Sequence, residues 1–192
     1  MSEHRVLVSS RVGLVAEVGL SIALAVVLGM LKVWQMPQGG ELSLAMLPLI
    51  VLSFRRGVVP GIIAGALYGI LDAQLNPYIV HWAQYVLDYP LAYALVGLAG
   101  VTAGRLRTSI GRPRAFATLI VGGVALGATA RYLAHTVSGI IFFAEYAPPG
   151  QPIVLYSAGY NSFVLVSAIA CAAAAVAIMP TLSRAVPVRK ES

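Results

Sequence analysis

The chain alternates between apolar runs and short polar segments. The apolar runs are built mainly from Val, Leu, Ile, Ala and Gly, and the segments between them contain charged residues, Gly or Pro. About 20 apolar residues cross the hydrocarbon core of a bilayer as a helix. The pattern therefore predicts membrane helices over residues 12–33, 44–54, 57–71, 79–104, 115–144 and 153–179.

The second and third predicted helices are shorter than a comfortable membrane span. A double arginine, Arg55-Arg56, separates them, and Asn76-Pro77 marks a turn after the third. We expect these two helices to form a compact hairpin packed inside the protein.

The positive charges are distributed unevenly along the chain. Eleven of the 13 Lys and Arg residues lie before the first predicted helix or after the second, fourth or sixth. The loops after the first, third and fifth helices contain no Lys or Arg. The eleven are Arg5, Arg11, Arg55, Arg56, Arg105, Arg107, Arg112, Arg114, Arg184, Arg189 and Lys190. The other loops carry Glu41, Asp72 and Glu145. Cytoplasmic loops of membrane proteins are enriched in Lys and Arg. The asymmetry predicts six transmembrane helices with both termini in the cytoplasm.

Composition supports an integral membrane protein. Only 10% of the residues are charged and the mean hydropathy is +0.85, whereas a soluble domain has about 25% charged residues. The single cysteine, Cys171, lies in an Ala-rich run and reads as a packing residue, so no intrachain disulfide is available. No composition shift divides residues 1–192, and we expect one all-α membrane domain. The basic residues form no stripe interleaved with aromatics, which argues against a nucleic-acid partner.

A few polar groups interrupt the apolar runs, and a charge inside a span costs at least about 2.5 kcal/mol, so each is a candidate site. They are Glu17, Lys32, Asp88, Arg131, His135 and Asn161. Glu17 and Lys32 lie near helix ends, where long side chains reach water, and a structural role is favoured for them. For Asp88 and Arg131 two interpretations stay open: a ligand site, or an ion pair that only joins helices.

Aromatic and polar side chains gather at one end of the last three helices and in the adjoining loops. They are Trp34, Tyr78, His81, Trp82, Tyr85, Asp88, Tyr89, Arg131, Tyr132, His135, Phe142, Phe143, Tyr146, Tyr156, Tyr160 and Asn161. An aromatic belt would mark both membrane interfaces, and the opposite ends have only Phe54 and Phe116 nearby. The cluster instead predicts an outward-facing pocket for a small, flat, cationic molecule with hydrogen-bonding groups. No metal-ligand spacing, nucleophile arrangement or phosphate-binding loop is visible, so we expect neither a metal, a cofactor nor an enzyme.

Three segments resemble the thiamine-specific substrate-binding (S) subunit of energy-coupling factor (ECF) transporters, the ThiT/YuaJ family. They are QYVLDYPLA at 84–92, RYLAHTVSG at 131–139 and EYAPPGQPIVLYSAGYN at 145–161, together with Trp34 after the first helix. The resemblance implies an S-component-like bundle in a prokaryotic cell membrane that binds thiamine. The ligand-binding positions that it implies are Trp34, Tyr78, Asp88, Tyr89, His135, Phe143, Tyr156 and Asn161. Asp88 stands where a well-characterised member has glutamate, and Phe143 where that member has tryptophan.

The resemblance also implies partners: a membrane coupling subunit and two cytoplasmic ATPases. In such subunits the first helix carries small residues spaced by four, which Gly19 and Ala23 continue here and Val15 interrupts. Packing within the helix bundle is the alternative use of these small residues. Two other functions stay open for the chain: an S subunit for another small heterocycle, such as a different vitamin or a pyrimidine precursor, and a structural membrane protein without a ligand.

Overall fold

The computed structural model describes the backbone of residues 2–185 and the side chains from Arg11 to Ser183. The cations predicted at Arg5, Arg184, Arg189 and Lys190 lie outside the described side chains. The described chain is almost entirely helical. In chain order its elements are α1 (Ser2–Met30), β1 (Trp34–Gln35), η1 (Pro37–Gly39), β2 (Glu41–Leu42), α2 (Met46–Arg56), α3 (Val58–Leu75), α4 (Trp82–Val86), η2 (Leu87–Leu91), α5 (Ala92–Val96), η3 (Gly97–Thr102), α6 (Ala103–Thr108), α7 (Pro113–Phe142), η4 (Ala144–Tyr146), α8 (Ile153–Tyr160) and α9 (Phe163–Ala185).

Five stretches of the described chain are long and apolar enough to cross a membrane. They cover residues 11–30, 58–75, 82–108, 113–142 and 153–183. The 11-residue α2 is too short to be among them and is largely buried, as expected for the inner helix of a hairpin. The prediction for its partner was wrong in length, because α3 continues to Leu75 and reaches 18 residues.

Other predicted boundaries also differ from the structure. The first helix ends at Met30 rather than at residue 33, because the chain turns there into a two-stranded hairpin in which Trp34 pairs with Leu42. The fourth begins at Trp82 rather than at 79, where the His81 side chain accepts a hydrogen bond from the backbone N–H of Ala83 and caps the first turn. The sixth is interrupted between α8 and α9 and ends later than predicted.

The helical rod of residues 82–108, which consists of α4, η2, α5, η3 and α6, is not a uniform α-helix. Pro90 lies inside it, and the surrounding residues Leu87–Leu91 form a π-helical turn, η2. Proline cannot donate a backbone hydrogen bond, and π turns insert one extra residue into a helix, often at functional sites. The turn places Asp88 and Tyr89 together along the wall of one cavity.

α3 packs against this rod at very close range. A Cβ atom added to Gly65 or Gly69 would collide with the backbone carbonyl oxygens of Tyr93 or Tyr89, respectively. Small residues spaced by four allow two membrane helices to approach in this way. The close approach brings the end of α3, with Asp72, next to η2.

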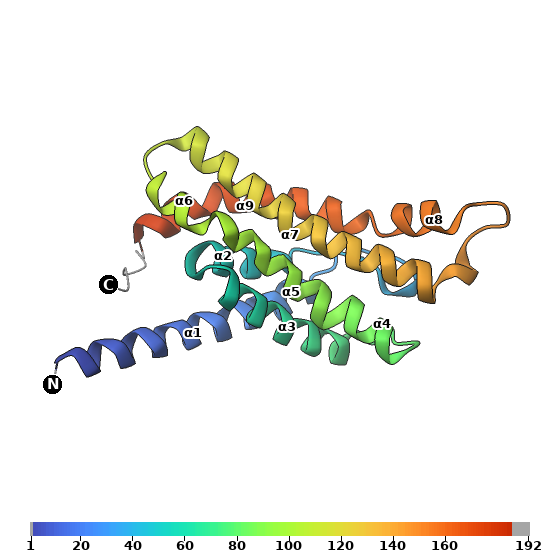
Figure 1. Cartoon of the computed structure of the whole chain (residues 1–192), viewed down its shortest axis with the longest axis horizontal. Coiled ribbons are helices and arrows are strands. Elements are labelled where there is room, and N and C mark those ends of the chain that lie inside the picture. The colour runs from blue at the N-terminus through green and yellow to red at the C-terminus, as the bar shows by residue number, and fades with distance from the viewer. Residues whose placement is uncertain (1, 186–192) are drawn as a thin grey trace.

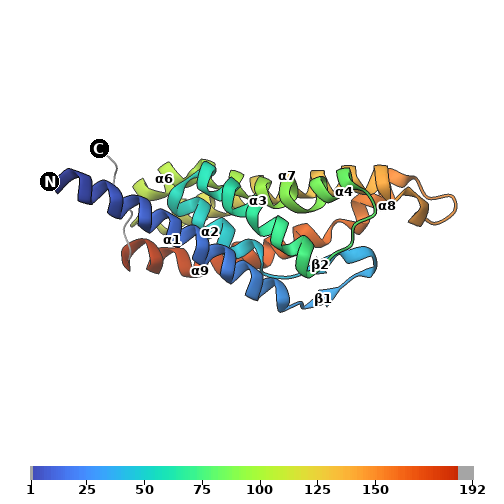
Figure 2. The same cartoon turned by 90° about the horizontal axis from the view of Figure 1, so that it is seen from below.

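The elements form an elongated bundle in which α7 and α9 lie side by side (Figures 1 and 2). Both ends of the described chain lie at one end of the bundle, together with the turn between α6 and α7. The loops after α1, α3 and α7 lie at the opposite end. Two ion-pair groups tie α1 and the residues that follow it to other parts of the chain. Glu17 pairs with Arg55 and Arg56 at 3.1 and 2.8 Å, and Lys32 pairs with Glu41 at 3.2 Å.

A central cluster of buried apolar side chains joins α1, α2, α3, α5, α7 and α9. Phe54, Tyr68, Tyr93 and Ile120 are among its largest members. Cys171 is fully buried in this cluster, so the prediction that it is a packing residue is confirmed.

Candidate functional site

A cavity opens at the end of the bundle that lies away from the chain termini. It has about 760 Å³ of empty volume, its open mouth included. Its walls come from the loops after α1 and α3, the ends of α3 and α7, the consecutive elements α4, η2 and α5, and from η4, α8 and the start of α9. They include eight aromatic rings, those of Tyr78, Tyr89, Tyr93, Phe143, Tyr146, Tyr156, Tyr160 and Phe163, and four charged side chains, those of Glu41, Asp72, Asp88 and Arg131.

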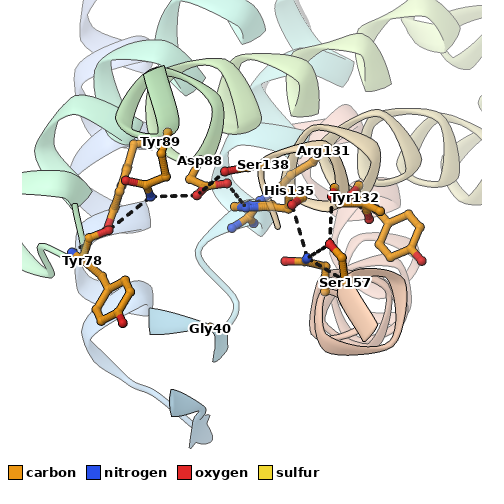
Figure 3. Close-up of polar contacts among 12 residues, drawn as sticks. Gly40, Tyr78, Asp88, Tyr89, Arg131, Tyr132, His135, Ser138 and Ser157 are labelled. Atoms are coloured by element: carbon orange, nitrogen blue, oxygen red, sulfur yellow. Dashed lines mark hydrogen bonds and ion pairs between the residues drawn. The ribbon is translucent and has the colours of Figure 1, made fainter. Parts of the chain in front are cut away.

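Asp88 is the most heavily hydrogen-bonded carboxylate of the cavity. Its Oδ2 accepts from Gln84 Nε2 at 2.7 Å and from Ser138 Oγ at 2.8 Å, and its Oδ1 lies 3.0 Å from His135 Nδ1 (Figure 3). Gln84 precedes Asp88 by four residues on the same rod, and the other two donors come from α7. A carboxylate has about four acceptor positions, so these three donors leave room for one more.

Arg131 lies beside His135 rather than on a carboxylate. Its Nε donates to His135 Nε2 at 3.2 Å, and its guanidinium carbon lies 3.9 Å from the centre of the Tyr93 ring. Among the side chains that the structure describes, Arg131 forms no ion pair with Asp88. The direct ion pair that the helix-joining interpretation assumed is therefore wrong for the described residues, since the connection runs through His135.

The loop after α3, which carries Tyr78, is fixed by the π turn. The Tyr89 hydroxyl accepts from the backbone N–H of Tyr78 at 2.8 Å and donates to the carbonyl of Asn76 at 3.0 Å. The Tyr78 hydroxyl lies 3.3 Å from that of Tyr146, and this hydrogen bond, with some loss of solvent, raises the pKa of Tyr78 to about 12. The Tyr78 ring is therefore held at the cavity as a neutral phenol.

α8 is docked onto the end of α7 by side chains on one face. Asn161 Nδ2 donates to the carbonyls of His135 at 3.2 Å and Ser157 at 2.9 Å, and Ser157 Oγ donates to the carbonyl of Thr136 at 2.8 Å. Tyr132 adds a bond from its hydroxyl to the carbonyl of Ala158 at 3.1 Å. The break between α8 and α9 is therefore held against α7, and it positions the start of the sixth predicted helix at the cavity.

The loop after α1 closes one side of the cavity and is tied down at two points. The Tyr160 hydroxyl accepts from the backbone N–H of Gly40 at 3.1 Å and donates to the carbonyl of Pro37. Glu41 pairs with Lys32, whose Nζ also donates to Asn76 Oδ1 at 2.8 Å. Burial and the nearby carboxylate of Asp72 raise the pKa of Glu41 above its ordinary value, although the ion pair opposes this shift.

The structure brings seven of the eight predicted ligand-binding residues into the wall of this cavity. They are Tyr78, Asp88, Tyr89, His135, Phe143, Tyr156 and Asn161. The eighth, Trp34, lies in β1 outside the described lining, and it is 64% exposed. Five further aromatics of the predicted cluster also lie outside the lining: His81, Trp82, Tyr85, Tyr132 and Phe142. His81 and Phe142 stack on each other with ring centres 5.1 Å apart, and Trp82 is exposed.

Sequence reasoning missed several polar residues of the site. Gln84 and Ser138 bind the Asp88 carboxylate directly, and Glu41 and Asp72 line the cavity although they were read only as charges in loops. Spacing could have identified the first two, because Gln84 lies four residues before Asp88 and Ser138 three after His135, and side chains at these spacings share a helix face.

Gly19 and Ala23 lie on an exposed face of α1. A Cβ atom added to Gly19 would meet no atom within 4 Å, so this glycine does not pack within the described bundle. The apolar Val15 and Val27 continue the same row and are also exposed. The alternative in which these small residues pack inside the bundle is therefore wrong for the described side chains.

Comparisons with known proteins place the chain in a family. The model of the family "Thiamine transporter protein (Thia_YuaJ)" matches residues 15–187. The thiamine transporter ThiT of Bacillus subtilis is 36% identical over 162 residues, which cover 81% of this chain and 84% of the relative. The thiamine transporter ThiT of Lacticaseibacillus paracasei is 35% identical over 123 residues, 61% of each chain. The solved structure of ThiT from Listeria monocytogenes superposes with a TM-score of 0.79 at 26% identity, over 92% of this chain and 96% of that one.

Proposed function

The chain belongs to the thiamine transporter family Thia_YuaJ, and we propose that it binds thiamine in the cavity described above, without a cofactor, as the substrate-binding subunit of an ATP-driven ECF importer. As a family member it is a multi-pass protein of the bacterial plasma membrane that serves thiamine uptake, a transport protein rather than an enzyme.

The observation that carries the proposal is the Asp88 carboxylate, whose side chain is 14% exposed at the wall of an aromatic cavity. Three protein donors hold it and one acceptor position stays open. The aminopyrimidine of thiamine carries an exocyclic amine that can donate to this position. A charge-assisted hydrogen bond of this kind is short and about twice as strong as a neutral one.

The charge balance of the cavity also suits thiamine, which carries one permanent positive charge on its thiazolium ring. Glu41, Asp72 and Asp88 supply three negative charges, and Arg131 with Lys32 supplies two positive charges. An unmatched buried charge is costly, and one bound cation would neutralise the set. Tyr78 and Phe143, with ring centres 6.0 Å apart, provide faces on which a flat cationic ring can stack.

We place six helices across or within the membrane, with both termini in the cytoplasm, because the cations concentrate at the end of the bundle that holds the chain termini. The ATP-hydrolysing partners would then lie on the cytoplasmic side, where the chain termini are, and the cavity would open to the outside of the cell. The exposed row on α1 that contains Gly19 and Ala23 is the surface proposed for the membrane coupling subunit, because small residues permit close helix contact.

A thermal-shift panel on the detergent-purified chain tests the ligand. Thiamine is expected to raise the melting temperature without ATP, whereas riboflavin, biotin and a free pyrimidine precursor at equal concentration are expected to raise it less. Stabilisation by another heterocycle but not by thiamine would refute the thiamine assignment and leave a transport subunit of different specificity. The absence of stabilisation by every compound would favour a structural membrane protein.

A further inference from the structure

A continuous hydrogen-bonded chain runs from Arg131 through His135 to Asp88 (Figure 3). Arg131 Nε lies 3.2 Å from His135 Nε2, and His135 Nδ1 lies 3.0 Å from Asp88 Oδ1. A guanidinium group has donors and no acceptor. His135 Nε2 is therefore the acceptor of this bond, and the proton of the neutral imidazole sits on Nδ1, where it is donated to Asp88.

The donor that fixes this tautomer is itself held in place. Arg131 is only 6% exposed, and its guanidinium is stacked over the Tyr93 ring at 3.9 Å. It precedes His135 by four residues on α7, so the two side chains lie on the same helix face. A buried, stacked guanidinium keeps few rotamers, and it can present Nε to one fixed point.

The arrangement leaves His135 no free nitrogen for a ligand. One ring nitrogen is bound to Arg131 and the other to Asp88, and the ring of Phe163 lies 5.8 Å away, centre to centre. The imidazole can offer a bound molecule a ring face, but no further hydrogen bond. Its polar atoms act on the ligand only through the carboxylate that they orient.

We infer that Arg131 is a positioning residue for ligand binding: its Nε fixes the Nδ1–H tautomer of His135, and that tautomer orients the Asp88 carboxylate toward the ligand. The inference rests on the proposed function, since it assigns to Asp88 the contact with thiamine. In the opposite tautomer, the Nδ1 lone pair would face Asp88 Oδ1, and two acceptors would oppose each other. Ser138 and Gln84 hold only Oδ2, so Oδ1 would turn away.

Two substitutions separate the Nε donor from the charge of Arg131. In Arg131→Gln the amide nitrogen stands at the same place along the side chain as Nε, so a donor to His135 is retained while the charge is lost. In Arg131→Met a methyl group takes that place, and both are lost. Both variants remove the guanidinium over Tyr93, so any effect of charge or stacking is shared by the pair.

The first readout is the thiamine Kd, measured by titration calorimetry on the two purified variants. We expect Arg131→Met to bind thiamine about tenfold more weakly than Arg131→Gln. A tenfold change in Kd corresponds to the upper range of the free energy that one neutral hydrogen bond contributes. The second readout is the ¹⁵N NMR spectrum of histidine-labelled protein without ligand. The chain has three histidines, and a His135→Asn variant assigns the signal. Wild type and Arg131→Gln are expected to show a protonated Nδ1 and an unprotonated Nε2, and Arg131→Met is expected to lose this signature.

Equal thiamine affinities and equal histidine spectra in the two variants would overturn the positioning role and leave thiamine binding intact. A proton on Nε2 in the wild type would overturn it as well. Failure of the wild type to bind thiamine would overturn the proposed function instead, while the spectra would still decide whether Arg131 sets the tautomer. Melting curves of the ligand-free variants identify any that do not fold, and the wild-type spectrum tests the tautomer without a variant.

Discussion

Replacing Asp88 by Asn keeps the volume of the side chain and removes its charge. In thiamine binding, the loss of a charge-assisted hydrogen bond of about 1.5–3 kcal/mol raises the Kd by roughly one to two orders of magnitude. The structure adds a second expectation. The carboxylate accepts from Gln84, Ser138 and His135, and an amide NH₂ group would oppose at least one of these donors. A buried donor left unpaired costs about 1–3 kcal/mol, so the ligand-free protein should melt earlier.

Because both effects are expected, a matched control is needed to separate them. Ser138→Ala removes one of the same hydrogen bonds from a fully buried position and leaves the Asp88 carboxylate in place. It should lower the melting temperature of the ligand-free protein but change the thiamine Kd much less than Asp88→Asn. Calorimetric titration and thermal melting on both variants measure the two quantities. An Asp88→Asn protein that melts early yet binds thiamine within threefold of wild type would refute the ligand role of this residue.

Four further predictions concern topology, packing, the site and the partner. Cysteine introduced at Gln151 should label from outside intact cells and cysteine at Ser109 should not; labelling at Ser109 would refute the orientation. Tyr156→Phe should raise the thiamine Kd by at most about tenfold, since only a neutral hydrogen bond is lost, and a larger loss by calorimetry would contradict a neutral contact. Gly69→Ala should destabilise the fold by about 1–3 kcal/mol in denaturation experiments, because its Cβ meets the backbone of η2. Gly19→Leu should leave thiamine binding unchanged and reduce ATP-driven uptake by the assembled importer; normal uptake would exclude this face as the docking surface.

Much of the architecture could be predicted from the sequence, because a membrane helix is recognised by the length of its apolar run. The hairpin of α2 and α3 and the long α7 were located within a few residues, and the loops that meet at the cavity followed from the order of the helices. The extra length of α3 could not be read, since Asp72 at its end looks like the start of a loop. In the structure this carboxylate is buried within the last turn and accepts a hydrogen bond from Asn76 at 3.2 Å.

The composition of the site was easier to predict than its connections. Asp88, His135 and Asn161 stood out because polar groups are rare in apolar helices. Which residues they contact depends on the face of the helix on which each side chain lies. The π turn at Pro90 changes this register for the helix that carries Asp88. An ion pair between Asp88 and Arg131 was therefore reasonable from charge alone. The structure instead inserts His135 between them, a contact that needs both the α7 register and the close approach of α7 to η2.

Several polar side chains of the cavity are already hydrogen-bonded to other side chains or to the backbone. His135 is bonded at both ring nitrogens, the Asn161 amide nitrogen at two carbonyls, and the Tyr89 hydroxyl as donor and acceptor. What stays open to a ligand in the described site includes one acceptor position on Asp88, the Tyr156 hydroxyl and a set of aromatic faces. Selectivity then depends on few groups held rigidly, and a ligand without a donor at the Asp88 position would leave a buried carboxylate without its fourth partner. Because these hydrogen bonds are already formed within the protein, little side-chain entropy remains to be lost on binding, and this preorganisation favours tight binding.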